Sequence, residues 1–469
     1  MPVSQAQRSL LSNALIERPP FHGSGVHKFP SDVLRVFVLG ESRPVLLNKD
    51  AASGHDFERL ARVCKSPAFG VNTADGGVQR NGLDRGKFAC NIDVARSGLL
   101  QRVHDALFSW EDQPREIEAE VAKLNVYGPG AFSECRTDAV REGDALFGYL
   151  VLVFPTPFEG GQLCLRHEGH TALHDASSST TANVYTSPNQ VSWAAFFNDV
   201  SHEILPVEDG YRVTLTYNLY YAEDSGMHVQ IPRVMRPEPI VYAFRQVLED
   251  VSFFPDGGRL GFALKHQYPV PEILTRSDHA DALNRICRTL KGSDHALLVA
   301  AQAAGLQPQL MLVYNLQDLG TFLSEQPIPR GTSLEKTNWE DIMKGLKADK
   351  IVWAADEIEY GITPISVIVT APAEDNEKEK EKTAMSPSAS TSSISTGTGQ
   401  LSPTSSTRRR KSIPMTAPDL FWVSPYASTH TRVETNYVKY GGRKASLAVM
   451  SGELVLIARI PSKENRALS

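Results

Sequence analysis

Four residues in the central part of the chain have types and spacings that could hold a metal ion and a carboxylate ligand. Asp138 precedes a long apolar run, and His202 lies further along, ten positions before Arg212. Carboxylate oxygens and imidazole nitrogens are common ligands of divalent transition metals. Thr214 follows Arg212 by two residues, and residues i and i+2 of a strand share one face. The guanidinium and the hydroxyl could therefore grip one carboxylate.

These residues fit most of the plan of a mononuclear Fe(II) oxygenase. Such an enzyme holds its iron with two histidines and one carboxylate, which leaves positions for 2-oxoglutarate and oxygen. A His-x-Asp pair on one strand face supplies two ligands, and a distant histidine supplies the third. The far carboxylate of 2-oxoglutarate needs a fixed positive fork, which arginine provides. In this chain Arg136 stands two residues before Asp138, where the first histidine would be.

The composition is typical of a soluble globular protein in a reducing compartment. Apolar residues make up 41% and charged residues 22% of the 469 positions. The net charge of -6 argues against a nucleic-acid partner, because a phosphate-binding surface needs a basic excess. We find no signal peptide and no membrane-spanning run, and the five scattered cysteines predict neither disulfides nor a zinc site. We expect a cytoplasmic or nuclear protein that acts on an unknown protein, peptide or small molecule, with no membrane partner.

The pattern of apolar residues divides the chain into five parts. Residues 1–121 mix short strands and helices, whereas 122–225 hold short runs rich in β-branched and aromatic residues, bounded by Gly, Pro and Asp. That spacing is typical of an antiparallel sandwich or barrel. Residues 226–371 mix helical and strand-like runs, and strands return in 418–469. The segment 372–417 has too few apolar side chains to offset the entropy of ordering it, so we expect a disordered insertion.

Several long motifs are specific enough to indicate a family. They are KLNVYGPGAF, LFGYLVLVFPTPFEGGQLCLRHEG, VSWAAFFNDVSHEILPVEDGYRVTLTYNLY, GGRLGFALKHQYPV, LKGSDHALLVAAQAAGL and VKYGGRKASLAVMSGELVLIARIP. In them the chain resembles the prolyl-4-hydroxylase-like 2-oxoglutarate/Fe(II) oxygenases, in particular a large-chain subgroup common in fungi. The resemblance implies an α+β fold with a double-stranded β-helix core, a jelly-roll or cupin-like barrel of about eight strands. Flanking N- and C-terminal α+β regions and the disordered insertion complete it.

The resemblance also implies an activity and a site. The activity would be a dioxygenase reaction that couples oxidative decarboxylation of 2-oxoglutarate to hydroxylation of an unknown substrate. Asp138 and His202 would bind Fe(II), while Arg212, Thr214 and Tyr127 would bind 2-oxoglutarate. Ascorbate could serve as an accessory reductant.

Arg136 departs from the His-x-Asp pattern of that family. A guanidinium has no acceptor lone pair, so Arg136 cannot ligate iron. It would point a positive charge at the metal position, or pair with Asp138 on the same strand face. The departure is confined to 132–145 while both flanks match, so a misplaced exon boundary is an alternative to divergence. Three functions stay open: an active dioxygenase, a catalytically impaired pseudo-oxygenase that binds a peptide or a carboxylate, and an interaction role with the insertion as a regulated tether.

Other side chains offer poor replacements for the missing ligand. Cys135 is adjacent to Arg136 and should face the opposite side of the strand. His167, His170 and His174 lie close together in the sequence, but such histidines are more often solvated or core residues than ligands. We therefore favour a site with only two protein ligands.

Overall fold

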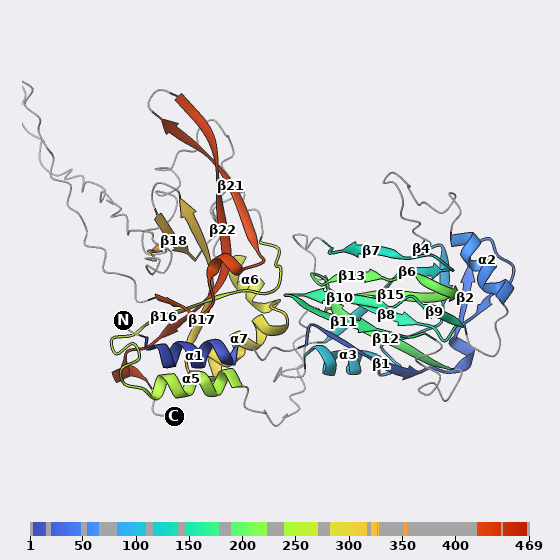
Figure 1. Ribbon diagram of the computed structural model, residues 1–469, viewed down its shortest axis with the longest axis horizontal. Coiled ribbons are helices and arrows are strands. Elements are labelled where there is room, and N and C mark those ends of the chain that lie inside the picture. The colour runs from blue at the N-terminus through green and yellow to red at the C-terminus, as the bar shows by residue number, and fades with distance from the viewer. Residues whose placement is uncertain are drawn as a thin grey trace, which may run out of the picture.

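The described part of the chain is a mixed α and β protein built on several β-sheets, as its sequence predicts. The computed structural model describes residues 3–15, 20–47, 54–64, 82–108, 116–138, 146–177, 189–222, 239–270, 282–316, 320–325, 327, 351–353, 420–441 and 444–466. These residues form two bodies that lie next to each other (Figure 1). The insertion predicted at 372–417 lies outside them, so its disorder stays a prediction.

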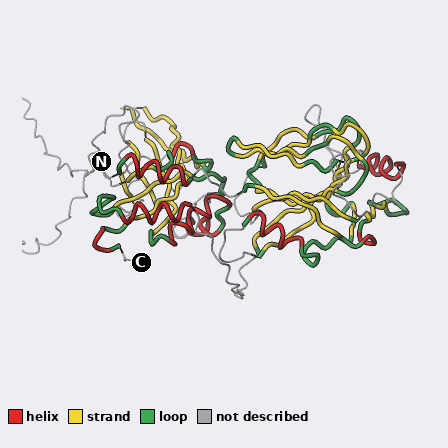
Figure 2. The backbone as a smooth tube through the Cα atoms, turned by 60° about the horizontal axis from the view of Figure 1, so that its bottom comes forward, coloured by secondary structure: helices red, strands yellow, loops and turns green. Residues whose placement is uncertain are grey.

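The first body is built on two antiparallel sheets that face each other (Figure 2). The larger sheet has six strands in the order β1 (His22–Lys28), β12 (Gln190–Phe197), β8 (Leu146–Val153), β15 (Arg212–Tyr221), β6 (Ile117–Tyr127) and β4 (Gly82–Asp84). The smaller has four in the order β11 (His170–His174), β10 (Leu163–His167), β13 (Ser201–Ile204) and β7 (Ser133–Arg136). A short pair, β14 (Val207–Gly210) with β9 (Phe158–Gly160), completes this arrangement.

Alternation along the strands decides which side chains face the space between the sheets. On β15, Val213 and Leu215 are fully buried in the main apolar core. Arg212 and Thr214 alternate with them and therefore face the other way, toward the smaller sheet. The opposite face of the larger sheet is covered by α3 (Leu99–Leu107), which contacts β1 and β12, while α2 (Gly54–Cys64) contacts β6. A small sheet of β2 (Arg35–Val38), β3 (Val45–Leu46) and β5 (Phe88–Cys90) shares the same core.

The second body packs helices on a further sheet and has its own apolar core. Its described strands are β16 (Gly258–Ala263), β17 (Gln307–Leu316), β18 (Gly320–Ser324), β19 (Ile351–Trp353), β20 (Leu420–Trp422), β21 (Arg432–Gly441) and β22 (Lys444–Ile460). Its helices are α1 (Gln5–Ala14), α5 (Pro239–Glu249), α6 (Ala282–Arg288) and α7 (Gly292–Ala303). Helix α1 comes from the start of the chain and contacts α5 (Figure 1), with Leu11 fully buried in this core.

The expected domain limits stay a prediction, but one of them cuts through a strand. The limit between 121 and 122 falls inside β6, whose whole length pairs with β15. Residues 1–121 therefore do not form a separate unit: β1, β4 and β6 belong to the large sheet, whereas α1 belongs to the second body. No helix among the described residues is both long and apolar enough to cross a membrane.

Candidate functional site

Pairing of β7 with β13 brings two of the expected site residues face to face. His202 on β13 lies opposite Arg136 on β7, and the neighbouring strand β10 places Leu165 beside His202. The His202 side chain points between the sheets, where its ring lies 5.2 Å from Phe196 and 6.1 Å from Tyr149, measured between ring centroids. Only 9% of His202 is exposed, so its ring nitrogens need partners within the protein.

Both ring nitrogens of His202 have such partners. Nδ1 lies 3.1 Å from the carbonyl oxygen of Val200, an acceptor, so Nδ1 carries the proton. The Nε2 lone pair accepts a hydrogen bond from Nε of Arg136 at 3.0 Å. Burial lowers the pKa of His202 and the Arg136 charge lowers it further, which keeps the imidazole neutral.

Asp138 lies in the same place but has a different partner from the one we expected. The Tyr149 hydroxyl hydrogen-bonds to the Asp138 carboxylate; burial and this contact together raise the pKa of Tyr149. The sequence suggested that Arg136 could pair with Asp138. The structure forms no such ion pair between these two described residues, and Arg136 turns its Nε toward His202 instead. The Arg136–His202 hydrogen bond is favoured because the His202 ring is buried, and its Nε2 acceptor would otherwise have no partner.

As arranged, this site does not fit Fe(II). An iron ion bound by His202 would use the Nε2 lone pair, which the Arg136 N–H already occupies. Asp138 would then be the remaining protein ligand. The positive charge of the Arg136 guanidinium would also repel the two positive charges of Fe(II). Cys135 offers no replacement, because it lies on the outer face within 3.7 Å of Arg166. His174 and His167 are held elsewhere, as described below.

A carboxylate, in contrast, suits the donors of Arg212 and its neighbours, called the Arg212 pocket below. Arg212 is 1% exposed, and neither Nη1 nor Nη2 has a hydrogen-bond partner among the described residues. Thr214, also 1% exposed, lies on the same face of β15. Tyr127 pairs with Arg212 across β6 and β15, and the guanidinium lies 5.7 Å from its ring centroid. The Asp175 charge acts on Arg212, but burial still lowers the pKa of Arg212, so a carboxylate bound by its free donors would offset a further desolvation penalty.

The local backbone makes room for this guanidinium. Gly161 has φ +66°, and a Cβ atom at that position would lie 3.0 Å from Cδ of Arg212. Burial lowers the pKa of Arg212 to about 10, so it stays charged at neutral pH. Burial raises the pKa of Tyr127, and the charges of Arg212 and Arg136 both oppose that rise. Tyr127 therefore lies within electrostatic reach of both arginines, between the expected metal ligands and the expected 2-oxoglutarate residues in its interactions.

The sequence interpretation missed two polar residues of this pocket. His174 on β11 has Nε2 2.9 Å from the Ser192 hydroxyl on β12. Burial and, next, the Arg212 charge lower the pKa of His174 to about 4, so the ring is neutral beside the guanidinium. Period-two alternation in HTALH could have placed His174 inward, but nothing in the sequence indicated which strand would face it.

A second group of possible ligands lies where the two bodies meet. His167, Asp199 and His266 have ligand atoms within 4.8 Å of one another. However, the rings of His167 and His266 stack at an interplanar angle of 17°, so one ion cannot lie in both ring planes. Asp199 is also paired with the Lys291 ammonium at 3.4 Å. This group therefore does not fit a metal ion in this arrangement.

Two buried histidines predict a loss of stability in mild acid. The pKa of His167 and of His174 is lowered to about 4, mainly by burial, whereas the ordinary value is 6.5. Between these values the unfolded chain binds protons that the folded chain does not, so the free energy of unfolding falls as the pH drops. The raised pKa of His430, which Glu168 causes, acts in the opposite direction, whereas the lowered pKa values of His22, His27 and His202 add to the loss.

The expected size follows from about 1.4 kcal/mol per pKa unit, or roughly 2 kcal/mol for each of the two histidines by pH 5. The urea midpoint should therefore be clearly lower at pH 5 than at pH 7. Replacing His174 by Gln should remove about 2 kcal/mol of this difference. Equal midpoints at the two pH values would show that these rings are not buried as described.

Comparison with known proteins gives structural likenesses of low similarity. No family model matches the chain, and no curated protein matches it. A prolyl-4-hydroxylase from Pseudomonas putida is similar at 18% identity and TM-score 0.26, covering 46% of this chain and 100% of that one. A 2OG-Fe(II) oxygenase family oxidoreductase from Burkholderia pseudomallei covers 46% and 91%, with 14% identity and TM-score 0.21. A viral collagen prolyl hydroxylase from Paramecium bursaria Chlorella virus-1 covers 43% and 97%, with 11% identity and TM-score 0.23. At these values a likeness identifies no function.

Proposed function

We propose that the first body is a double-stranded β-helix of the 2-oxoglutarate oxygenase type that binds a carboxylate ligand and does not assemble an iron centre. The observation that carries the proposal is the hydrogen bond from Arg136 Nε to His202 Nε2. It takes the lone pair that iron would need and puts a cation in the place of a ligand. The protein would then act as a pseudo-oxygenase, a carboxylate-binding module in the pocket of an oxygenase.

The ligand class follows from the charges in the pocket. Arg212 offers a planar fork of donors that matches a carboxylate, with the Thr214 hydroxyl on the same strand face. Arg136 supplies a second positive charge within electrostatic reach of Tyr127. A ligand with two carboxylates, such as 2-oxoglutarate or succinate, offers one carboxylate for each of these two cations. A monocarboxylate of similar length should bind more weakly, because one guanidinium would stay unpaired.

An anaerobic titration of the full chain with Fe(II) and 2-oxoglutarate tests this proposal. We expect 2-oxoglutarate to bind with the same affinity with and without Fe(II), and no metal-to-ligand charge-transfer band to develop in visible light. A band that saturates at one iron per chain would overturn the proposal. It would mean that Arg136 moves away and a complete iron centre forms.

The dioxygenase predicted from the sequence is the second candidate. The dioxygenase is favoured by the electrostatic contacts that link the expected site residues: Asp138 acts on His202, and Arg136 and Arg212 both act on Tyr127. Arg136 is also an exposed residue on an edge strand, so its side chain has room to turn outward. Iron-dependent formation of succinate from 2-oxoglutarate by the unmodified chain would favour this candidate over a binding module.

A further inference from the structure

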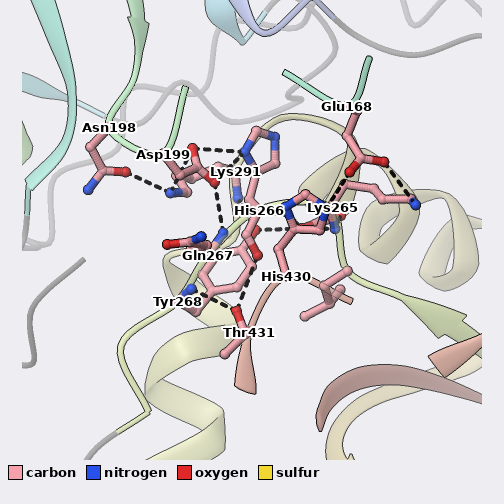
Figure 3. A network of polar contacts seen from close by, with 12 residues as sticks. Glu168, Asn198, Asp199, Lys265, His266, Gln267, Tyr268, Lys291, His430 and Thr431 are labelled. Atoms are coloured by element: carbon pink, nitrogen blue, oxygen red, sulfur yellow. Dashed lines mark hydrogen bonds and ion pairs between the residues drawn. The ribbon is translucent and has the colours of Figure 1, made fainter. Parts of the chain in front are cut away.

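A network of charged side chains joins the two bodies and is buried where Asp199 meets Lys291 (Figure 3). The first body contributes two carboxylates, Glu168 in the turn between β10 and β11 and Asp199 in the turn between β12 and β13. The second body contributes the cations. Lys265 lies 2.9 Å from Glu168, which also pairs with His430, and Lys291 lies 3.4 Å from Asp199. The acidic groups of one body thus meet the basic groups of the other.

Asp199 makes both hydrogen bonds and an ion pair within this network. Its carboxylate accepts from Nδ1 of His266 at 3.0 Å and from the backbone N–H of Gln267 at 2.7 Å, besides its ion pair with Lys291. Its side chain and that of Lys291 are each only 2% exposed. Burial alone would raise the pKa of Asp199, but Lys291 and His266 hold it well below its usual range. Ionised Asp199 therefore fixes its turn against the second body.

The turn held in this way leads directly to His202. Asn198 receives a hydrogen bond from the Lys291 ammonium at 2.8 Å and donates to the Leu146 carbonyl at 2.9 Å. Val200, the next residue after Asp199, accepts the Nδ1 proton of His202 through its carbonyl oxygen. That carbonyl at Nδ1 and the Arg136 donor at Nε2 together decide which ring nitrogen of His202 is protonated. Lys291 thus reaches the His202 ring through one short turn.

We propose that Asp199 and Lys291 are positioning residues, through which the second body holds His202 in the tautomer whose Nε2 lone pair faces Arg136. The inference rests on the proposed function, in which that lone pair is held by a guanidinium rather than by iron. The second body is then part of the site, although none of its described residues touches His202.

Two variants and one matched control test this inference in the full chain. Lys291→Met removes the cation that grips the turn, and Asp199→Asn removes the charge but keeps the shape. Lys265→Met breaks an ion pair of the same interface that involves Glu168 and not the turn. With ¹⁵N-labelled histidine, NMR reports the protonation of each ring nitrogen, and His202→Gln assigns the signals. In the unmodified chain we expect one protonated and one unprotonated nitrogen for His202.

Lys291→Met and Asp199→Asn should turn this single tautomer into an exchanging mixture, while Lys265→Met should leave it unchanged. An unchanged tautomer in both variants would overturn the inference, and so would an equal change in the control, because the interface would then act only as a general support. If Asp199→Asn does not fold, Lys291→Met decides alone. A mixed tautomer already present in the unmodified chain would also contradict it.

Binding of 2-oxoglutarate to the same samples separates this inference from the proposed function. If the unmodified chain does not bind 2-oxoglutarate, the proposed function fails while the tautomer data still judge the role of Asp199. If it binds and the tautomer does not respond to Lys291, the positioning role fails alone. Addition of zinc to chelator-treated protein provides a further check, because saturable shifts of the His167 and His266 signals would show a metal site there and overturn our account of the network.

Discussion

Arg136→His should raise the affinity of the chain for Fe(II) by at least about 100-fold. The substitution removes the guanidinium that occupies the His202 lone pair and adds an imidazole on the strand facing His202. Both effects act in the same direction, and changes that only reorient existing metal ligands already alter affinity by about 10- to 100-fold. Equilibrium dialysis under anaerobic conditions measures the change. With 2-oxoglutarate present, the charge-transfer band should appear in the variant.

Two control variants separate the causes. Arg136→Gln removes the positive charge but supplies no imidazole, so it should give a smaller gain than Arg136→His. Arg166→His places a histidine on the outer face of the same sheet, where Arg166 pairs with Glu203, and should leave iron binding unchanged. Strong stoichiometric binding by the unmodified chain, or no gain in Arg136→His, would show that this residue is not what keeps iron out.

Arg212→Met should weaken 2-oxoglutarate binding by about 30-fold or more. Removing one partner of a buried charged contact costs about 2–5 kcal/mol, and 1.4 kcal/mol corresponds to a factor of ten. Arg212→Lys keeps a charge but loses the planar fork, so its affinity for 2-oxoglutarate should lie between that of the unmodified chain and that of Arg212→Met. Arg166→Met, an exposed arginine outside the pocket, serves as the control for calorimetry. Unchanged affinity in Arg212→Met would place the ligand elsewhere.

The same variant should also melt at a higher temperature than the unmodified chain when no ligand is present. Arg212 is buried and neither of its Nη atoms has a hydrogen-bond partner among the described residues, so the Asp175 charge offsets only part of the cost of burying it. Methionine fills a similar volume without that penalty. Loss of binding together with a gain in stability is expected of a residue kept for function. A large drop in melting temperature would instead show that the guanidinium has a structural partner.

The sequence indicated the parts of the site that depend on local spacing. Arg212 and Thr214 share a face because strands alternate, and the same rule placed Arg136 and Asp138 together and turned Cys135 outward. The partner of Arg136 could not be read from spacing, since His202 reaches it only through the pairing of β7 with β13. For the same reason the sequence suggested Asp138 as the partner of Arg136, whereas in the structure Asp138 hydrogen-bonds to Tyr149.

Contacts between distant segments were beyond sequence reasoning altogether. Asp199 and Lys291 are buried polar residues whose roles depend on how the two bodies meet. Nothing near either residue in the sequence indicates that its charge is buried. Helix α1 is a similar case: its amphipathic pattern fits any apolar surface, and only the fold shows that it packs on α5.

Calorimetric titration of the chelator-treated, unmodified chain with 2-oxoglutarate tests the central claim most directly. If Arg212 binds a carboxylate while Arg136 replaces iron, one molecule should bind per chain without any metal, and added Fe(II) should leave the affinity unchanged. Succinate should compete, and butyrate should compete poorly. Binding that requires Fe(II), or no binding under either condition, would contradict the account.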